Sequence, residues 1–167
     1  SDPWGRGRWC QIQGWGSLRH TLVESWITHP WVPGQVATAA LPGAGERGID
    51  GIDHAVLNVS KSEFSAAVAW YVDHLGFEPQ QWFKIETLWS ALHSQVLTSP
   101  EGTAQLPINE PVTPTSQVQE FLHWNRGAGI QHVALHTSDI FQTVHQLKQG
   151  GVEFIDVPTA YYQALGQ

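Results

Sequence analysis

Two histidines occupy equivalent places in a repeated segment and could bind one metal ion together. The segment Ile52-Asp53-His54-Ala55-Val56-Leu57 returns as Ile130-Gln131-His132-Val133-Ala134-Leu135. When a unit is duplicated, equivalent residues become related by an approximate two-fold axis, so side chains far apart in sequence can converge. Neutral imidazoles are suitable ligands for iron, zinc, copper and nickel. The repeat therefore predicts that His54 and His132 are metal ligands, although a single such histidine is more often a hydrogen-bonded core residue.

The carboxylate that would complete the ligand set is not evident. Two imidazoles alone do not hold a catalytic metal, and a third ligand, usually a carboxylate, completes a facial triad with open positions. Strand alternation predicts that Asp53 points to the face opposite His54. Glu153 lies at the wrong point of the repeat. The residues by themselves leave the third ligand unassigned.

Each histidine is expected on the first strand of a unit. The alternation of residues predicts strands at 52–59 and 130–137, with His54 and His132 each on the face that carries aliphatic neighbours. We therefore expect both imidazoles to be buried or nearly so.

The first unit is expected to have the order β-α-β-β-β. Apolar residues at helical spacing predict a helix over 63–75, with Ser60 or Ser62 as N-cap and Gly76 at its end. The predicted strands that follow are 77–83, 90–98 and 104–109.

The second unit begins in the same way. Ser116 has the form of a helix cap and opens a short bridging helix that Gly127 ends. A strand at 130–137, a helix at 139–149 and a strand at 152–157 follow. Two further strands would be needed to match the first copy. We therefore expect the second unit to be incomplete, with its remainder beyond Gln167.

The residues before the repeat divide into two parts. Short alternating runs over 9–24, around Gly14 and Gly16, predict a β-hairpin, and we assign residues 1–33 to the end of an N-terminal domain. Prolines and glycines at 34–50 predict a linker. Residues 51–167 form the metal-binding domain, which gives an α+β fold of paired β-α-β-β-β units.

Composition restricts the class of protein. With 41% hydrophobic and 14% charged residues, the chain is typical of a globular protein. A net charge of −7 gives no basic footprint for nucleic acid, and no segment is apolar enough to span a membrane. The absence of a leader predicts a cytoplasmic protein, and the absence of methionine indicates a piece of a longer one. A homo-oligomer is left open.

These segments resemble the 4-hydroxyphenylpyruvate dioxygenases, iron(II) enzymes of the vicinal oxygen chelate superfamily. The resemblance covers nearly all of 51–167, and the opening hairpin is similar to the end of that family's N-terminal domain. The motifs that carry it are Ile52-Asp53-His54, Leu75-Gly76-Phe77, Ser90-Ala91-Leu92-His93-Ser94, Leu106-Pro107-Ile108-Asn109-Glu110-Pro111, Ser116-Gln117-Val118-Gln119, Gly127-Ala128-Gly129-Ile130-Gln131-His132 and Val152-Glu153-Phe154.

The resemblance implies a cofactor and a reaction. His54 and His132 would be two of three iron(II) ligands, and the third would be a glutamate beyond Gln167. The substrates would be 4-hydroxyphenylpyruvate and O2, and the products homogentisate and CO2, in tyrosine catabolism or quinone precursor synthesis.

The resemblance also implies a substrate site. Ser94, Asn109 and Gln117 would orient the substrate, with the phenol end as the natural target of the amides, and Pro107 would line the apolar slot beside them. Gln131 matches a further position in the family pocket, although strict alternation sends it away from the face of His132.

Three alternatives remain. Hydroxymandelate synthase would use the same iron, substrate and fold but direct oxygen to the side chain. A non-catalytic piece would lack the third ligand. A glyoxalase-like relative would use a similar metal site on another substrate, but Pro107-Ile108-Asn109 together with Ser116-Gln117 disfavours it.

Overall fold

A computed structural model describes residues 9–23, 48–87, 90–157, 159 and 163. The described residues divide into two compact units. The first comprises 9–23 with the described part of 52–135, and the second comprises 48–51 with the described residues from 136 onward. Most of the predicted linker at 34–50 lies outside the described residues.

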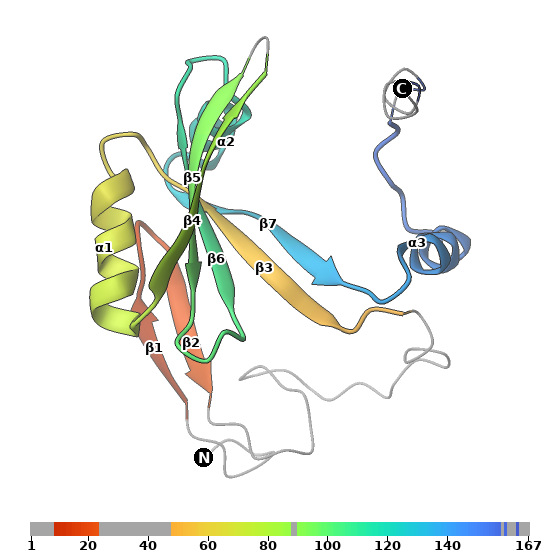
Figure 1. Cartoon of the computed structure of the whole chain (residues 1–167), viewed down its shortest axis with the longest axis horizontal. Coiled ribbons are helices and arrows are strands. Elements are labelled where there is room, and N and C mark those ends of the chain that lie inside the picture. Colours follow the sequence, from red (N-terminus) through yellow and green to blue (C-terminus); the bar gives the residue numbers. More distant parts are fainter. Residues whose placement is uncertain (1–8, 24–47, 88–89, 158, 160–162, 164–167) are drawn as a thin grey trace. The chain divides into compact units, whose positions relative to one another are not determined.

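The first copy of the repeat has the predicted β-α-β-β-β order (Figure 1). Its elements are β3 (Gly51–Asn58), α1 (Phe64–Leu75), β4 (Glu78–Glu86), β5 (Ala91–Thr98) and β6 (Gln105–Pro111). The sheet has the order β4-β5-β6-β3-β7, in which β7 (Gly129–His136) is the first strand of the second copy. The α+β fold class and the start of a paired second copy are confirmed.

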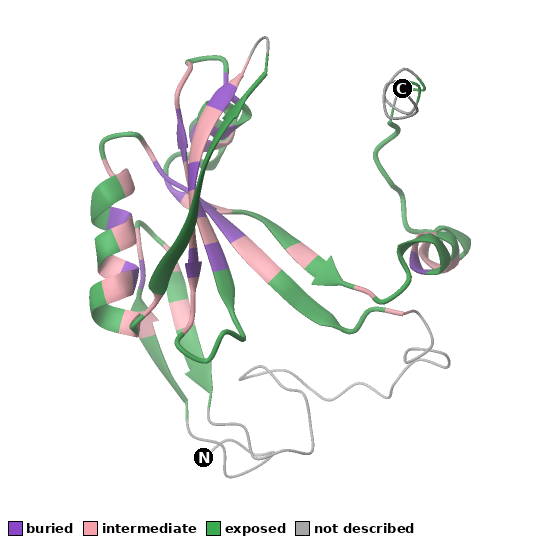
Figure 2. Cartoon of the chain, in the orientation of Figure 1, coloured by how far each residue is buried: buried purple, intermediate pink, exposed green. Residues whose placement is uncertain are grey.

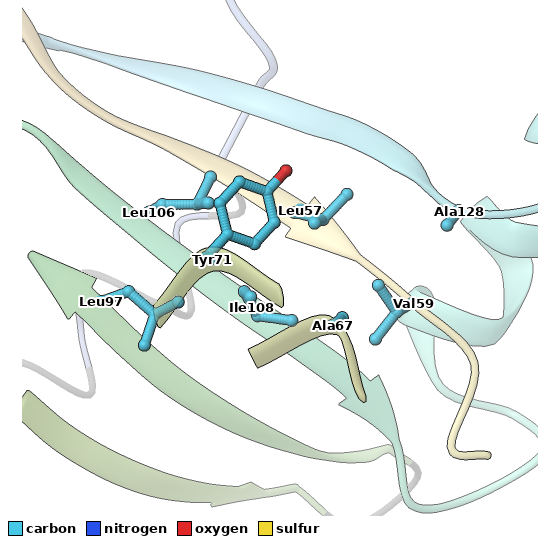
Figure 3. Close-up of a cluster of buried hydrophobic side chains, with 8 residues drawn as sticks. All are labelled: Leu57, Val59, Ala67, Tyr71, Leu97, Leu106, Ile108 and Ala128. Atoms are coloured by element: carbon cyan, nitrogen blue, oxygen red, sulfur yellow. The ribbon is translucent and has the colours of Figure 1, made fainter. Parts of the chain in front are cut away.

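One face of this sheet packs against α1. Ala67 and Tyr71 of α1 are fully buried and lie over Leu57, Leu97 and Ile108 from three different strands (Figure 3). Apolar side chains three to four residues apart share one face of a helix, which is why this stretch buries a continuous stripe. By strand alternation, His54 and Asn58 of β3 lie on the opposite side of the sheet from Leu57 of this cluster.

The two ends of α1 differ in how well they were predicted. Gly76 ends the helix with φ 68°, a left-handed conformation that glycine adopts without strain. The predicted serine N-cap is wrong, because Glu63 occupies that position without a side-chain cap. A turn precedes the helix instead, and the Glu63 carboxylate accepts hydrogen bonds from the backbone N–H and hydroxyl of Ser60.

The bridging helix α2 (Gln117–Asn125) begins as predicted. The buried Ser116 is its N-cap, and its Oγ accepts a hydrogen bond from Gln119 N at 3.1 Å. Arg126, rather than Gly127, is the C-cap and adopts a left-handed φ of 59°. The cap therefore supports the prediction that a new helix separates the two copies.

The predicted hairpin is formed by β1 (Trp9–Gln13) and β2 (Arg19–Val23), which pair in antiparallel fashion. The hairpin packs on α1. His20 Nε2 lies 3.0 Å from the Tyr71 hydroxyl, and its ring contacts Trp70. The assignment of the hairpin to an N-terminal domain stays a prediction.

The second compact unit contains α3 (Ile140–Gln149), which begins at the predicted place. Its N-cap Asp139 accepts a hydrogen bond from Gln142 N at 3.0 Å. The predicted strand at 152–157 is wrong, since these residues form no strand and are exposed (Figure 2). A strand is stable only when its backbone groups pair with a neighbour, and no described strand pairs with this segment.

The contact between His20 and Tyr71 predicts a pH-dependent stability. Burial lowers the pKa of His20 below 6.5 and raises the pKa of Tyr71 to about 12. The unfolded chain therefore binds a proton to His20 more readily than the folded one. The stability that the neutral imidazole contributes is complete above pH 6.5 and is lost as the pH falls below it.

Urea unfolding of the whole protein at pH 7.5 and 5.5 tests this expectation. The wild type should lose more free energy of unfolding between these pH values than His20→Gln, which has no titrating group there. Parallel losses in the two proteins would contradict it.

Candidate metal centre

The pairing of β3 with β7 brings His54 and His132 together. The two strands are hydrogen-bonded neighbours, and each is the first strand of its copy. The centroids of the two imidazole rings lie 5.6 Å apart, with the ring planes inclined at 73°. Residues 78 positions apart in sequence therefore present two imidazole rings in one place.

The residue before each histidine contacts its ring. Asp53 Oδ2 lies 2.6 Å from His54 Nδ1, and Gln131 Oε1 lies 2.5 Å from His132 Nδ1. A carboxylate or an amide oxygen only accepts, so both Nδ1 atoms donate a hydrogen. The Nε2 atom of each ring then carries the lone pair that a metal requires.

Strict alternation predicts that Asp53 and Gln131 point away from the histidines that follow them. The carboxylate of Asp53 and the amide of Gln131 instead reach these histidines. Both residues lie at exposed positions, where no packed layer holds their side chains on the opposite face. Each therefore folds around the strand toward the following histidine. The proposed role of Gln131 in substrate binding stays a prediction.

The two histidines are less buried than expected. The side chain of His54 is 28% exposed, and His132 belongs to the exposed residues of β7. The reason is that β7 is the edge strand of the described sheet. Partial removal from water, and then the proximity of His54, lower the pKa of His132. Both effects favour the neutral imidazole, which is the form that binds metal.

A row of polar side chains crosses the same face of the sheet. In the strand register Ser94 lies opposite Asn109, and Asn109 lies beside Asn58. Asn58 lies four positions after His54 along β3, so period-two alternation puts both side chains on one face of the sheet. The structure thus brings Ser94 and Asn109 to the face of the histidines.

Pro107 also lies on this face, next to Val96 in the register. It lies two positions before Asn109 on β6, so the two side chains share a face, as expected. Gln117 differs, because it is the first residue of α2 and is exposed. Its side chain makes no hydrogen bond with the described part of the chain.

Asn58 is a feature of this face that the sequence did not single out. Its side chain is fully buried, and neither its Nδ2 nor its Oδ1 has a hydrogen-bond partner among the described residues. Its place on the face of His54 was readable from alternation, but its burial was not. A buried amide without partners is costly, so this position carries a polar group at the expense of stability.

The described residues supply two candidate metal ligands, His54 and His132, and no third. Among them, no group of three His, Cys, Asp or Glu side chains could hold a metal ion. Glu153 is exposed and lies outside any strand. Two imidazoles with free Nε2 atoms nevertheless suit a borderline metal such as iron(II). The donor chemistry fits this metal, while the ligand set within the described residues is partial.

Comparisons with known proteins agree with this arrangement. Residues 51–167 match the family model described as Glyoxalase/Bleomycin resistance protein/Dioxygenase superfamily. A 4-hydroxyphenylpyruvate dioxygenase of Legionella pneumophila (strain Corby) is 38% identical over 139 residues, which cover 83% of this chain and 38% of the relative. The enzyme of the same name from Caenorhabditis briggsae is 35% identical over 185 residues, which cover 100% of this chain and 46% of the relative.

A solved structure supports the fold. A mutant of 4-hydroxymandelate synthase from Streptomyces coelicolor superposes with a TM-score of 0.75 at 26% identity, covering 94% of this chain and 46% of that one. The chain thus spans less than half the length of each of these three proteins. No helix in the described part is long and apolar enough to cross a membrane.

Replacement of Asn58 by leucine tests whether its amide is unpaired in the folded protein. The two side chains have similar volumes, so the free energy of unfolding should stay unchanged or rise by about 1–3 kcal/mol. Ser116→Ala is the control, since it removes a buried polar group that does have a partner and should cost about 1 kcal/mol. Chemical denaturation measures both variants. A clear loss of stability in Asn58→Leu would show that the amide is hydrogen-bonded, for example by buried water.

Proposed function

The chain belongs to the Glyoxalase/Bleomycin resistance protein/Dioxygenase superfamily, and from this premise we propose that it carries the metal centre of an iron(II)-dependent dioxygenase. The observation that carries the proposal is the meeting of His54 and His132 from the first strands of the two copies, 5.6 Å apart between ring centroids. The names of the two relatives support the choice of a dioxygenase.

The proposed reaction converts 4-hydroxyphenylpyruvate and O2 to homogentisate and CO2. When bound, iron(II) would supply a centre that chelates the 2-oxo acid and activates dioxygen. His54 and His132 would hold the metal through their Nε2 atoms. We propose that a glutamate beyond position 167 in the whole protein is the third ligand.

The face of the sheet gives the substrate its orientation in this proposal. Ser94 and Asn109 lie in the row that meets β3 at Asn58, about 13 Å along the strand from His54 at roughly 3.3 Å per residue. Polar groups at this distance suit the phenol end of a substrate whose oxo-acid end lies at the histidines. Val96 and Pro107 supply apolar surface for the ring between the two ends.

A second candidate reaction is the formation of hydroxymandelate from the same substrate. The solved structure of a hydroxymandelate synthase, at a TM-score of 0.75, favours keeping it. The described residues do not distinguish the two reactions, because both would use the same two histidines. We propose no catalysis for the 167 residues alone, since no group of three His, Cys, Asp or Glu side chains among the described residues could hold a metal ion.

Substitution of either histidine tests the proposed function in the whole protein. His54→Ala and His132→Ala should each lower kcat/KM for 4-hydroxyphenylpyruvate by more than about 100-fold, since loss of a supporting residue alone costs roughly 10–100-fold. His136→Ala is the matched control, because His136 is on β7 but pairs with Asp50 at 3.3 Å. Oxygen consumption and chromatography of the product provide the measurements. Recovery of hydroxymandelate in place of homogentisate would reject the first reaction in favour of the second.

A further inference from the structure

Asp53 and Gln131 occupy equivalent places in the two copies, each immediately before a histidine of the metal centre. We propose that these two residues are positioning residues that orient the imidazoles and raise their affinity for the metal, Asp53 more strongly than Gln131. The inference rests on the proposed function for the identity of the metal, iron(II).

The first step of the argument is the direction of the two hydrogen bonds. Since Asp53 Oδ2 and Gln131 Oε1 accept from Nδ1 at 2.6 and 2.5 Å, the neutral ring of each histidine has its hydrogen on Nδ1. Rotation of either ring would break its contact. Both lone pairs are therefore held ready before a metal arrives, and less ordering is needed when it binds.

The second step is that the two copies differ in charge. The Asp53 carboxylate accepts a charge-assisted hydrogen bond, whereas the Gln131 amide accepts a neutral one. A carboxylate behind a metal-binding imidazole makes that imidazole a stronger donor. His54 should thus be the stronger ligand of the pair, although duplication put both histidines in equivalent places.

The third step separates these contacts from other histidine contacts. Carboxylates also lie beside other imidazoles: His93 Nδ1 donates to Glu110 Oε1 at 2.8 Å, and His136 Nδ1 lies 3.3 Å from Asp50 Oδ2. Among the described residues, only the rings of His54 and His132 also face another imidazole. Within the described chain, two adjacent imidazoles that are each oriented by a hydrogen bond therefore occur at the metal centre alone.

The role proposed for Gln131 can be distinguished from substrate binding. A residue that only contacts substrate does not affect metal affinity when the substrate is absent. A residue that orients His132 affects metal affinity even when the substrate is absent. Titration of the whole, metal-free protein with iron(II) under anaerobic conditions, without substrate, therefore separates the two roles.

Asp53→Ala should weaken iron(II) binding by roughly 10–100-fold. Asp53→Asn should weaken it less, because asparagine retains an acceptor oxygen like that which Gln131 presents to His132. Gln131→Ala should also weaken binding, by less than Asp53→Ala. Asp50→Asn is the matched control, since it alters an aspartate–histidine contact away from the centre and should leave the affinity unchanged.

Circular dichroism of each variant shows whether it is folded, and Asp53→Asn provides the test if Asp53→Ala is not. Equal iron(II) affinity in the wild type and in folded Asp53 and Gln131 variants would overturn the inference but leave the proposed function standing. A Gln131→Ala variant with lower affinity for substrate alone would overturn the role of Gln131. A wild-type protein that binds no iron(II) would overturn the proposed function, and the inference with it.

Discussion

The hydrogen-bonded pairing of β3 with β7 is the interaction on which the candidate site depends. Each strand is the first of its copy, so their pairing converts an internal repeat into two adjacent imidazoles. Without this pairing, His54 and His132 would be isolated histidines on different strands. Because β7 is also the edge strand of the described sheet, the same interaction leaves the candidate site accessible.

The two faces of the sheet perform different tasks. One face buries Tyr71 and its apolar partners under α1 and stabilises the unit. The other face carries the histidines and, further along the same strands, the row of Ser94, Asn109 and Asn58. The buried amide of Asn58 has no hydrogen-bond partner among the described residues, which is a cost to stability on this second face. Local features of this kind are typical of functional sites, where a conflict with stability is tolerated.

Most elements of the fold followed from local sequence patterns. The alternation at 52–57, the helical spacing before Gly76 and the cap at Ser116 each depend on near neighbours in the chain, and the structure agrees with them. The prediction of a strand at 152–157 was wrong because it depended on residues far from the segment in the chain. An extended segment becomes a strand only through hydrogen bonds to a partner, and its own residues do not supply one.

For the site, the sequence by itself determined which histidines are equivalent, because a repeat is visible without coordinates. Only the tertiary structure decided how they are oriented. Strand alternation predicts where a side chain leaves the backbone, but the carboxylate of Asp53 and the amide of Gln131 are free to fold toward the next residue because their positions are exposed. The complete burial of Asn58 was likewise decided by packing across strands, a long-range property that no local pattern of residues encodes.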